Sequence, residues 1–350
     1  MEEKLVTGQA GKTGIKRLSI IIAVAFFASL SLWGNDYFIN LFSLLFLYMS
    51  LGQMWNLLAG YSGMISLGQQ IFVGLGGYTI AVMTERLGQG VFLSFLAAIG
   101  VSVAFAFVIS FPIFKMRGIY FTIGTWIIAE ALSVYFVNWS FVNYAIGFNI
   151  RIGYSFSPRI IYFMAFLIAI GAIAIVYFLL RSKTGLALMA IRDDTNAAEV
   201  RGVKLYQTKL KIFLITSGYT ALIGAVLYLN FVYIVPRAAF AIDWTVIMVF
   251  IVIIGGIGTI EGPIVGAVAY IFIRQYLYNF PGISLIILGV VAVAIILSIP
   301  KGIMGTLHAR FGFELFSVRR GFGESQGTLT TLRDILLGRK AEAGNEKSDT

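Results

Sequence analysis

The chain has 350 residues, of which 59% are hydrophobic and 12% are charged, and its mean hydropathy is +0.90. Soluble domains carry about 25% charged residues, so this composition excludes an ordinary soluble protein and indicates a membrane protein. The absence of cysteine excludes disulfides, thiolate catalysis and cysteine-ligated metals. The net charge of +10 is gathered beside apolar segments, which is typical of membrane topology rather than of nucleic-acid binding.

Residues 1–17 are predicted to form a basic cytoplasmic tail. They contain "GQAGKTG" at 8–14, in which Gly-Lys-Thr resembles the end of a phosphate-binding loop. That motif requires a glycine five residues before Gly11, where this chain has Val6, and a preceding strand, of which the sequence gives no sign. We therefore predict no nucleotide site in this tail, and any ATP that the system uses is expected to bind to another chain.

Apolar runs of about 17–24 residues recur along the chain and are long enough to cross a hydrocarbon core of about 30 Å as helices. Helices are expected because backbone groups in lipid must form their hydrogen bonds internally. The predicted fold class is an all-α polytopic membrane protein with about ten transmembrane helices; short, glycine-interrupted runs leave eight or nine as alternatives. The predicted spans are 18–33, 38–60, 67–84, 91–114, 119–138, 160–180, 210–229, 245–258, 262–279 and 283–300.

Lysine and arginine set the orientation, because basic residues gather on the cytoplasmic side of membrane spans. With ten spans, one side receives the basic groups before span one, between spans four and five, between spans six and seven, and after the last span. The opposite loops carry only Arg86, Arg151, Arg159 and Arg237. Both termini are therefore predicted to be cytoplasmic. The predicted parts of the chain are the tail 1–17, a membrane domain at 18–306 with a cytoplasmic loop at 181–211, and a partly disordered cytoplasmic tail at 307–350.

The stretch "IRDDTNAAEVRGVK", residues 191–204, holds three acidic and three basic residues in an otherwise apolar chain. Asn196 is predicted to cap a short helix with Glu199 in a capping box, and Gly202 is predicted to end it in the left-handed conformation. A helix of about one and a half turns is marginal alone and persists only when it is docked. Its alanine pair is expected to allow close approach by a partner, and its charges to set the register; an ordinary charged loop is the alternative. The residues predicted to make this contact are Arg192, Asp193, Asp194, Asn196, Ala197, Ala198, Glu199 and Gly202.

Glycines and polar groups within the apolar spans mark candidate positions for a substrate. Residues 60–77 and 255–266 are rich in glycine, which permits either close helix packing or broken helices whose ends bind charged groups. Both interpretations stay open for 60–77, whereas packing or a cytoplasmic turn is favoured for 255–266. Glu130 lies near the centre of a span, where an unpaired carboxylate costs about 2.5–3.5 kcal/mol, so we expect it to face a water-filled path or a structural partner. The pathway candidates are Gly63, Ser66, Gly68, Gln69, Thr122 and Glu130.

Several segments together resemble a known family. "NAAEVRGVKLYQTKLKIFL" is similar to the coupling-loop signature of ABC importer permeases, with Asn196 in place of the usual glutamate and Ile215 in place of the usual proline. The order of five further segments resembles that of branched-chain amino-acid ABC transporter permeases of the LivM type, and the resemblance covers residues 35–306. These segments are "GYSGMISLGQQIFVGLGGYT", "KMRGIYFTIGTWIIAEAL", "TGLALMAIRDD", "IVIIGGIGTIEGPIVGA" and "ILSIPKGIMG".

The resemblance implies a permease subunit of an ABC importer in the prokaryotic inner membrane, surrounded by the lipid bilayer. It would move branched-chain amino acids, or a related small polar substrate such as urea or an amide, into the cytoplasm. No cofactor is expected on this chain, because the resemblance places ATP and magnesium on two partner ABC ATPase subunits. A second homologous permease chain and an extracytoplasmic solute-binding protein are the other implied partners, and no nucleic acid is expected.

Two other classes of function, an ion-coupled transporter or channel and an intramembrane enzyme, would require different residues from an importer. An ion-coupled secondary transporter or channel is the alternative, and it predicts several intramembrane acids or bases, of which Glu130 is the only clear one. An intramembrane enzyme would require paired carboxylates, a metal set or an activated nucleophile. The chain has one histidine, His308, in its C-terminal region, so we predict no catalytic residue and no metal ligand.

Overall fold

The fold is given by a computed structural model that describes residues 26–30, 34–277, 286–287, 289–291, 293–294, 298–299 and 302–311. The chain divides into a unit of residues 1–316 and a second unit of residues 317–350, and all described residues lie in the first. Its elements are α2 (Asp36–Ser62), α3 (Gln70–Glu85), α4 (Val91–Ile113), α5 (Ile119–Val137), the 3-10 turns η1 (Ser140–Val142) and η2 (Tyr144–Ile146), β1 (Phe148–Asn149), the 3-10 turn η3 (Arg151–Ser155), α6 (Pro158–Arg181), α7 (Lys183–Asp193), α8 (Thr195–Val200), α9 (Leu205–Phe231), β2 (Tyr233–Ile234), α10 (Pro236–Ala239), α11 (Asp243–Gly255), α12 (Gly262–Leu277) and α14 (Gly302–Phe311).

The described helices fit an all-α membrane protein. Six helical segments are long and apolar enough to cross a bilayer: α2, α4, α5, α6, α9 and the pair α10–α11. By contrast, α3 and α12 have 16 residues each, or about 24 Å at 1.5 Å per residue, which is short for a span. Most of the predicted span 18–33 and half of the predicted span 283–300 fall outside the described residues. The predicted boundary between membrane domain and C-terminal tail, at 306, falls within α14.

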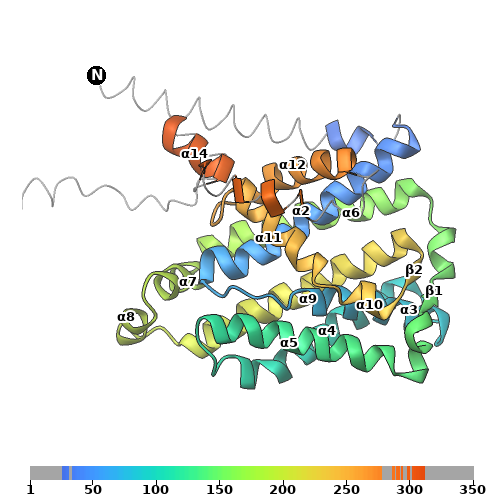
Figure 1. The fold of residues 1–350 in the computed structure, drawn as a ribbon, viewed down its shortest axis with the longest axis horizontal. Helices are drawn as coiled ribbons and strands as arrows, with labels where there is room; N and C mark the ends of the chain where they lie inside the picture. The colour runs from blue at the N-terminus through green and yellow to red at the C-terminus, as the bar shows by residue number, and fades with distance from the viewer. Residues whose placement is uncertain are drawn as a thin grey trace, which may run out of the picture. The chain divides into compact units, whose positions relative to one another are not determined.

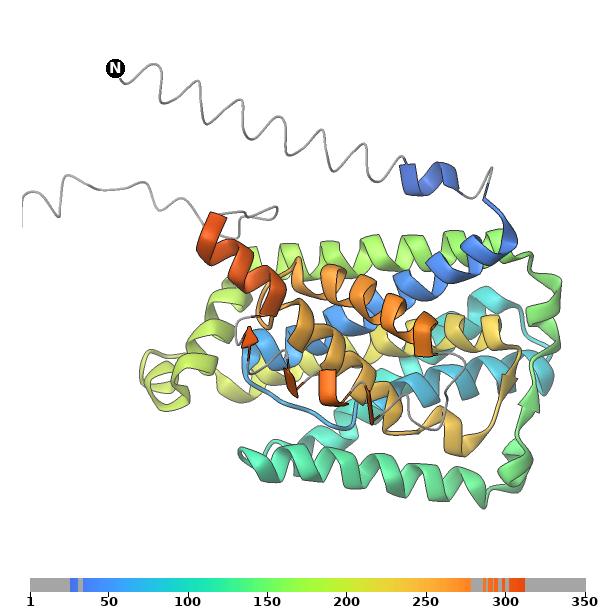
Figure 2. The same cartoon turned by 45° about the horizontal axis from the view of Figure 1, so that its top comes forward.

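The core is built around α2 and α9. In the most apolar part of each helix, 83% and 78% of the residues are buried, against 28% in α4 and in α5. Helix α2 packs on α6, α9, α11 and α12, while α3 and α4 pack on α9. The helix α5 runs along one edge in both views (Figures 1 and 2) and leaves much of its surface uncovered.

The two ends of the helical unit are distinct. At one end, α7 and α8 join α6 to α9, and we call this the α7 end (Figure 1). At the other end, β1 pairs antiparallel with β2, with Phe148 opposite Ile234, and we call this the β end. Basic residues predicted to be cytoplasmic, such as Arg117, Arg192 and Lys209, share the lining of one cavity at the α7 end. This grouping agrees with the charge pattern from which the orientation was predicted.

Several glycines lie where two helices approach each other too closely for a larger side chain. A Cβ on Gly76 would lie 1.9 Å from the carbonyl oxygen of Ala221, where α3 crosses α9. A Cβ on Gly255 would lie 1.8 Å from the carbonyl oxygen of Gly262, across the turn between α11 and α12. The favoured interpretation of 255–266 as packing and a turn is therefore confirmed, and the turn lies at the α7 end, where Gly258 approaches Arg192.

Candidate coupling segment and pathway

The polar stretch forms two helices at the α7 end. Helix α7 turns its small and apolar residues Gly185, Leu188 and Ile191 inward, and it packs on α2, α6 and α9. Helix α8 follows after a single residue, Asp194, and has six residues. The short helix predicted for this stretch is thus present as α8. Helix α7 contacts α8 and connects it to the packed helices.

The N-terminal cap of α8 is Asp194, not Asn196 as the sequence predicted. Its carboxylate Oδ1 accepts hydrogen bonds from the amides of Asn196, at 2.8 Å, and Ala197, at 3.0 Å. Asp194 can do this because its backbone is extended, with φ −155° and ψ 111°, as a capping residue requires. Asn196 already lies inside the first turn, so Glu199 is too far along the helix to complete a capping box.

Gly202 ends α8 as predicted, with φ +84°. The amide of Gly202 donates to the carbonyl of Glu199 at 2.9 Å, and the amide of Val203 donates to that of Ala198 at 3.0 Å. These two bonds form the Schellman motif, which satisfies carbonyls that the helix end would otherwise leave open. A helix of only six residues is therefore closed at both ends.

Removing the cap is expected to loosen α8 without unfolding the protein. Asp194→Ala deletes the acceptor of two amides and should cost about 1 kcal/mol of local stability. Hydrogen exchange of the peptide around 194–203 should then be faster than in the parent chain. Asp193→Ala is the matched control, since its exposed ion pair with Arg192 is worth less than about 1 kcal/mol. Equal protection in the Asp194→Ala and Asp193→Ala variants would contradict the capping role.

The two alanines of α8 do not share a face. Ala198 is 1% exposed and packs onto its own chain, whereas Ala197 is exposed. The outward side of the helix also presents Asn196, Glu199 and Val200, whose apolar side chain is 89% exposed. The predicted alanine face for a partner is therefore wrong in this respect: Ala198 holds α8 on the protein, and a partner would meet Ala197 and Val200.

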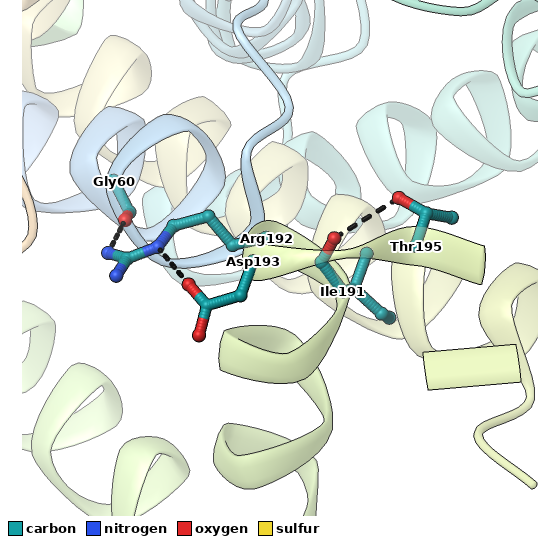
Figure 3. A network of polar contacts seen from close by, with 5 residues as sticks. All are labelled: Gly60, Ile191, Arg192, Asp193 and Thr195. Carbon is teal, nitrogen blue, oxygen red and sulfur yellow. Dashed lines mark hydrogen bonds and ion pairs between the residues drawn. The ribbon is translucent and has the colours of Figure 1, made fainter. Parts of the chain in front are cut away.

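Arg192 reaches back toward the membrane helices. Its Nη1 donates to the carbonyl of Gly60 at 2.8 Å, near the end of α2, while its Nε lies 3.5 Å from Oδ1 of Asp193 (Figure 3). The same view shows Thr195 Oγ1 donating to the carbonyl of Ile191 at 3.1 Å, which binds the start of α8 to the end of α7. Arg192 therefore connects α7 with α2, a role that the sequence did not reveal.

The turn between α11 and α12 joins this junction. The side chain of Asn56 on α2 donates to the carbonyl of Thr259 and accepts from the amide of Gly258, both at 2.8 Å. Gln53 Nε2 donates to the carbonyl of Ile260 at 2.6 Å. Because Gly258 also lies beside the Arg192 guanidinium, α2, the α11–α12 turn and α7 form one hydrogen-bonded junction.

The pathway candidates on 63–69 belong to an unwound segment between α2 and α3 (Figure 1). The carbonyl of Ser66 accepts from the indole of Trp55 at 2.9 Å, and a Cβ on Gly68 would lie 2.4 Å from the Thr125 carbonyl oxygen. The helical path is therefore interrupted at 63–69, as the broken-helix interpretation of 60–77 predicts. Gly68 within this segment also permits close packing against Thr125, as the packing interpretation predicts.

The first-turn amides of α3 are satisfied within the protein. Those of Ile71 and Phe72 donate to the carbonyls of Gly68 and Gln69 at 3.1 Å, and that of Gln70 donates to Thr245 Oγ1 at 3.3 Å. These three amides at the start of α3 already have acceptors within the protein.

Two cavities lie along α5. One, of about 850 Å³ at the α7 end, includes Gly63 and Thr122 in its lining; Ser66, Gly68 and Gln69 are not part of that lining. The other, of about 510 Å³, includes Glu130. At 100° per residue, one stripe of α5 faces both cavities. On this stripe, Ile119 and Thr122 line the larger cavity, and Glu130, Ser133 and Val137 line the smaller one. Trp126 lies between these two groups and lines neither cavity.

The fold defines an all-α, multi-pass membrane protein. The sequence matches, over residues 17–298, the family described as "branched-chain amino acid transport system / permease component". The chain belongs to this family, and the resemblance seen in the sequence is confirmed. It is a transporter component rather than an enzyme. Within the described ranges, no group of three histidine, aspartate or glutamate side chains is arranged to hold a metal ion.

Three curated proteins illustrate the relationship. The high-affinity branched-chain amino acid transport system permease protein LivM of Salmonella typhimurium is 24% identical over 296 residues, covering 76% of this chain and 69% of that protein. Its counterpart from Escherichia coli is 23% identical with the same coverage. A probable branched-chain amino acid transport permease protein of Methanocaldococcus jannaschii is 29% identical over 126 residues, covering 34% and 35% of the two chains. No solved structure matches the chain.

Proposed function

We propose that this chain is the permease subunit of an ATP-driven importer that carries branched-chain amino acids into the cytoplasm. The observation that carries the proposal is α8, a six-residue helix closed at both ends with an apolar side chain turned outward. A helix this short is marginal alone, so its closed ends and its packing on α7 hold it in a defined position for a contact with a partner. The partner that we assign to α8 is a cytoplasmic ATPase, because residues 196–214 resemble the coupling-loop signature of ABC importer permeases.

The coupling proceeds through the junction of α7, α2 and the α11–α12 turn. When ATP closes the ATPase pair, the contact displaces α8 and, with it, α7. The bond from Arg192 to Gly60 and the bonds from Asn56 and Gln53 to the turn pass this movement to the helices. Small displacements are effective here because packed helices shift as units rather than deform continuously. The membrane helices then alternate access between the two sides.

The assembly contains two ATPase subunits, which bind ATP and magnesium, and a second homologous permease chain. The chain has one α7–α8 segment in its described part, so a pair of ATPases requires a second permease. The poorly covered surface of α5 is the face that we assign to this partner. We assign Glu130, which is exposed on this apolar helix, to the pathway rather than to the contact with the partner. A solute-binding protein delivers the substrate at the β end, and the complex resides in the prokaryotic inner membrane.

Placing a charge on the outward face of α8 is expected to break the ATPase contact. Val200→Glu and Ala197→Glu should each lower co-elution of the ATPase with the permease by at least about tenfold, since each puts an unpaired carboxylate into a desolvated interface. Ile257→Glu is the matched control, because Ile257 is 53% exposed on the α11–α12 turn at the same end. Undiminished co-elution of both α8 variants would refute the proposed docking.

A further inference from the structure

The cavity of about 510 Å³ combines residues of α5 with residues of α10 and the turn that follows it. Helix α5 and the residue after it contribute Glu130, Ser133, Val134, Val137 and Asn138, and the second segment contributes Arg237, Phe240 and Ala241. Asn138 follows the last residue of α5, and Arg237 follows β2 by three residues, so the cavity opens in the half of the protein next to the β end. This volume lies in the range of about 300–1,000 Å³ that is typical of small-molecule sites.

Two opposite charges line this cavity without neutralising each other. Glu130 and Arg237 are both exposed. Within the described part of the chain, neither side chain forms a hydrogen bond or an ion pair, whereas Arg192 and Asp193 do pair. A charge on a membrane helix that has no partner is costly unless it faces water or a ligand. The cavity therefore offers one anionic and one cationic group, each with its bonding capacity open.

The remaining lining is mostly apolar. Val134, Val137, Phe240 and Ala241 supply aliphatic and aromatic surface, and only Ser133 and Asn138 add neutral polar groups. Such a composition, with apolar walls and a few polar groups at fixed places, is what orients a small ligand. A ligand that matches it has a positive group, a negative group and a compact hydrocarbon part.

We propose that this cavity binds a zwitterionic α-amino acid with an apolar side chain. The carboxylate of Glu130 accepts from the α-ammonium group, and the guanidinium of Arg237 donates to the α-carboxylate, for which its planar fork is suited. The apolar walls receive the side chain. This inference rests on the proposed function and adds a binding site for its substrate, because amino acids carry both charges whereas urea and simple amides carry neither. The site would accept the substrate as it enters from the solute-binding protein.

Equilibrium binding of radiolabelled leucine to the purified complex, without the solute-binding protein, tests the site. Glu130→Gln and Arg237→Gln are each expected to weaken leucine binding by about tenfold or more, since each removes a charge-assisted hydrogen bond. Tyr135→Phe on α5 and Arg159→Gln at the β end are matched controls, because neither residue lines the cavity. Both controls are expected to bind leucine like the parent complex. Parental binding in both cavity variants would overturn the proposal.

Competition by analogues separates the two charges. Leucinamide lacks the carboxylate and 4-methylpentanoate lacks the ammonium, so each should compete at least about tenfold more weakly than leucine. Glu130→Gln should weaken leucinamide but not 4-methylpentanoate, and Arg237→Gln should do the reverse. Competition by urea at leucine-like concentrations would overturn the assignment.

The oligomeric state and the ATPase content of each variant keep this inference distinct from the proposed function. The cavity variants should retain the ATPase, since α8 is unchanged. Loss of the second permease chain from Glu130→Gln would place Glu130 in the subunit interface and overturn the binding site. Loss of ATPase binding only in the α8 variants would leave the proposed function standing whatever the leucine result.

Discussion

Replacing Arg192 by methionine is expected to lower uptake by about tenfold or more while the ATPase remains bound. The guanidinium donates to the carbonyl of Gly60 at 2.8 Å and approaches Gly258, so it links α7 to α2 and to the α11–α12 turn. Methionine fills a similar volume but donates no hydrogen bond. Losing a bond from a charged donor costs about 1.5–3 kcal/mol, which is about tenfold to a hundredfold in the equilibrium that couples the two parts.

The measurements are ATPase co-elution, ATP hydrolysis stimulated by the solute-binding protein, and leucine uptake in proteoliposomes. Arg192→Met should retain co-elution and basal hydrolysis, but lose stimulation and uptake by about tenfold or more. Arg192→Lys keeps a positive donor and should lose less. Arg201→Met is the matched control, because Arg201 is an exposed arginine just after α8. Full uptake by Arg192→Met would show that this bond does not transmit the movement.

Much of the coupling segment could be predicted from its sequence because its signals are local. The left-handed Gly202 follows from chain geometry over a few residues, and so does the existence of a short helix in a polar stretch. The cap was misplaced by two residues because Asp194, Thr195 and Asn196 are all competent caps, and the choice depends on where α7 ends. The inward turn of Ala198 and the reach of Arg192 to Gly60 depend on contacts distant in sequence, which no local pattern encodes.

The membrane helices also combine features that the local sequence predicts with features that depend on contacts distant in sequence. Hydropathy located α4, α5 and α6 to within a few residues, because lipid imposes length and apolarity on each helix separately. It also indicated that the third span, 67–84, is short, as α3 is. It did not show that α3 follows an unwound segment, since Ser66 and Gly68 are accommodated there by Trp55 and Thr125 from other helices. Likewise, the prediction that Glu130 faces a path or a structural partner stays a prediction. Arg237, which lines the same cavity as Glu130, lies on α10 and is found there only in three dimensions.

Valine at position 76 or at position 224 is expected to prevent the permease from folding. These glycines form the crossing of α3 and α9 from its two sides. A Cβ on Gly76 would lie 1.9 Å from the carbonyl oxygen of Ala221, and one on Gly224 would lie 2.4 Å from that of Val73. The obstacle in each case is a backbone oxygen within a helix, so relief requires the helices to separate. Overpacked cores lose about 1–3 kcal/mol when side chains can adjust, and a backbone obstacle should cost more.

The experiment compares the yield and the thermal unfolding of monodisperse detergent-solubilised protein for Gly76→Val, Gly224→Val and Gly100→Val. Gly100 lies on α4, and a Cβ there would meet no atom within 4 Å, so its valine variant controls for the loss of glycine itself. We expect Gly100→Val to purify like the parent and both crossing variants to fail or to unfold at a markedly lower temperature. Gly76→Ala and Gly224→Ala should be milder than valine but still below the parent, because the Cβ alone makes the clash. Normal yields of the alanine variants would contradict the close crossing. They would mean that α3 and α9 lie far enough apart to hold a Cβ that would be only 1.9 Å from the Ala221 oxygen in the present structure.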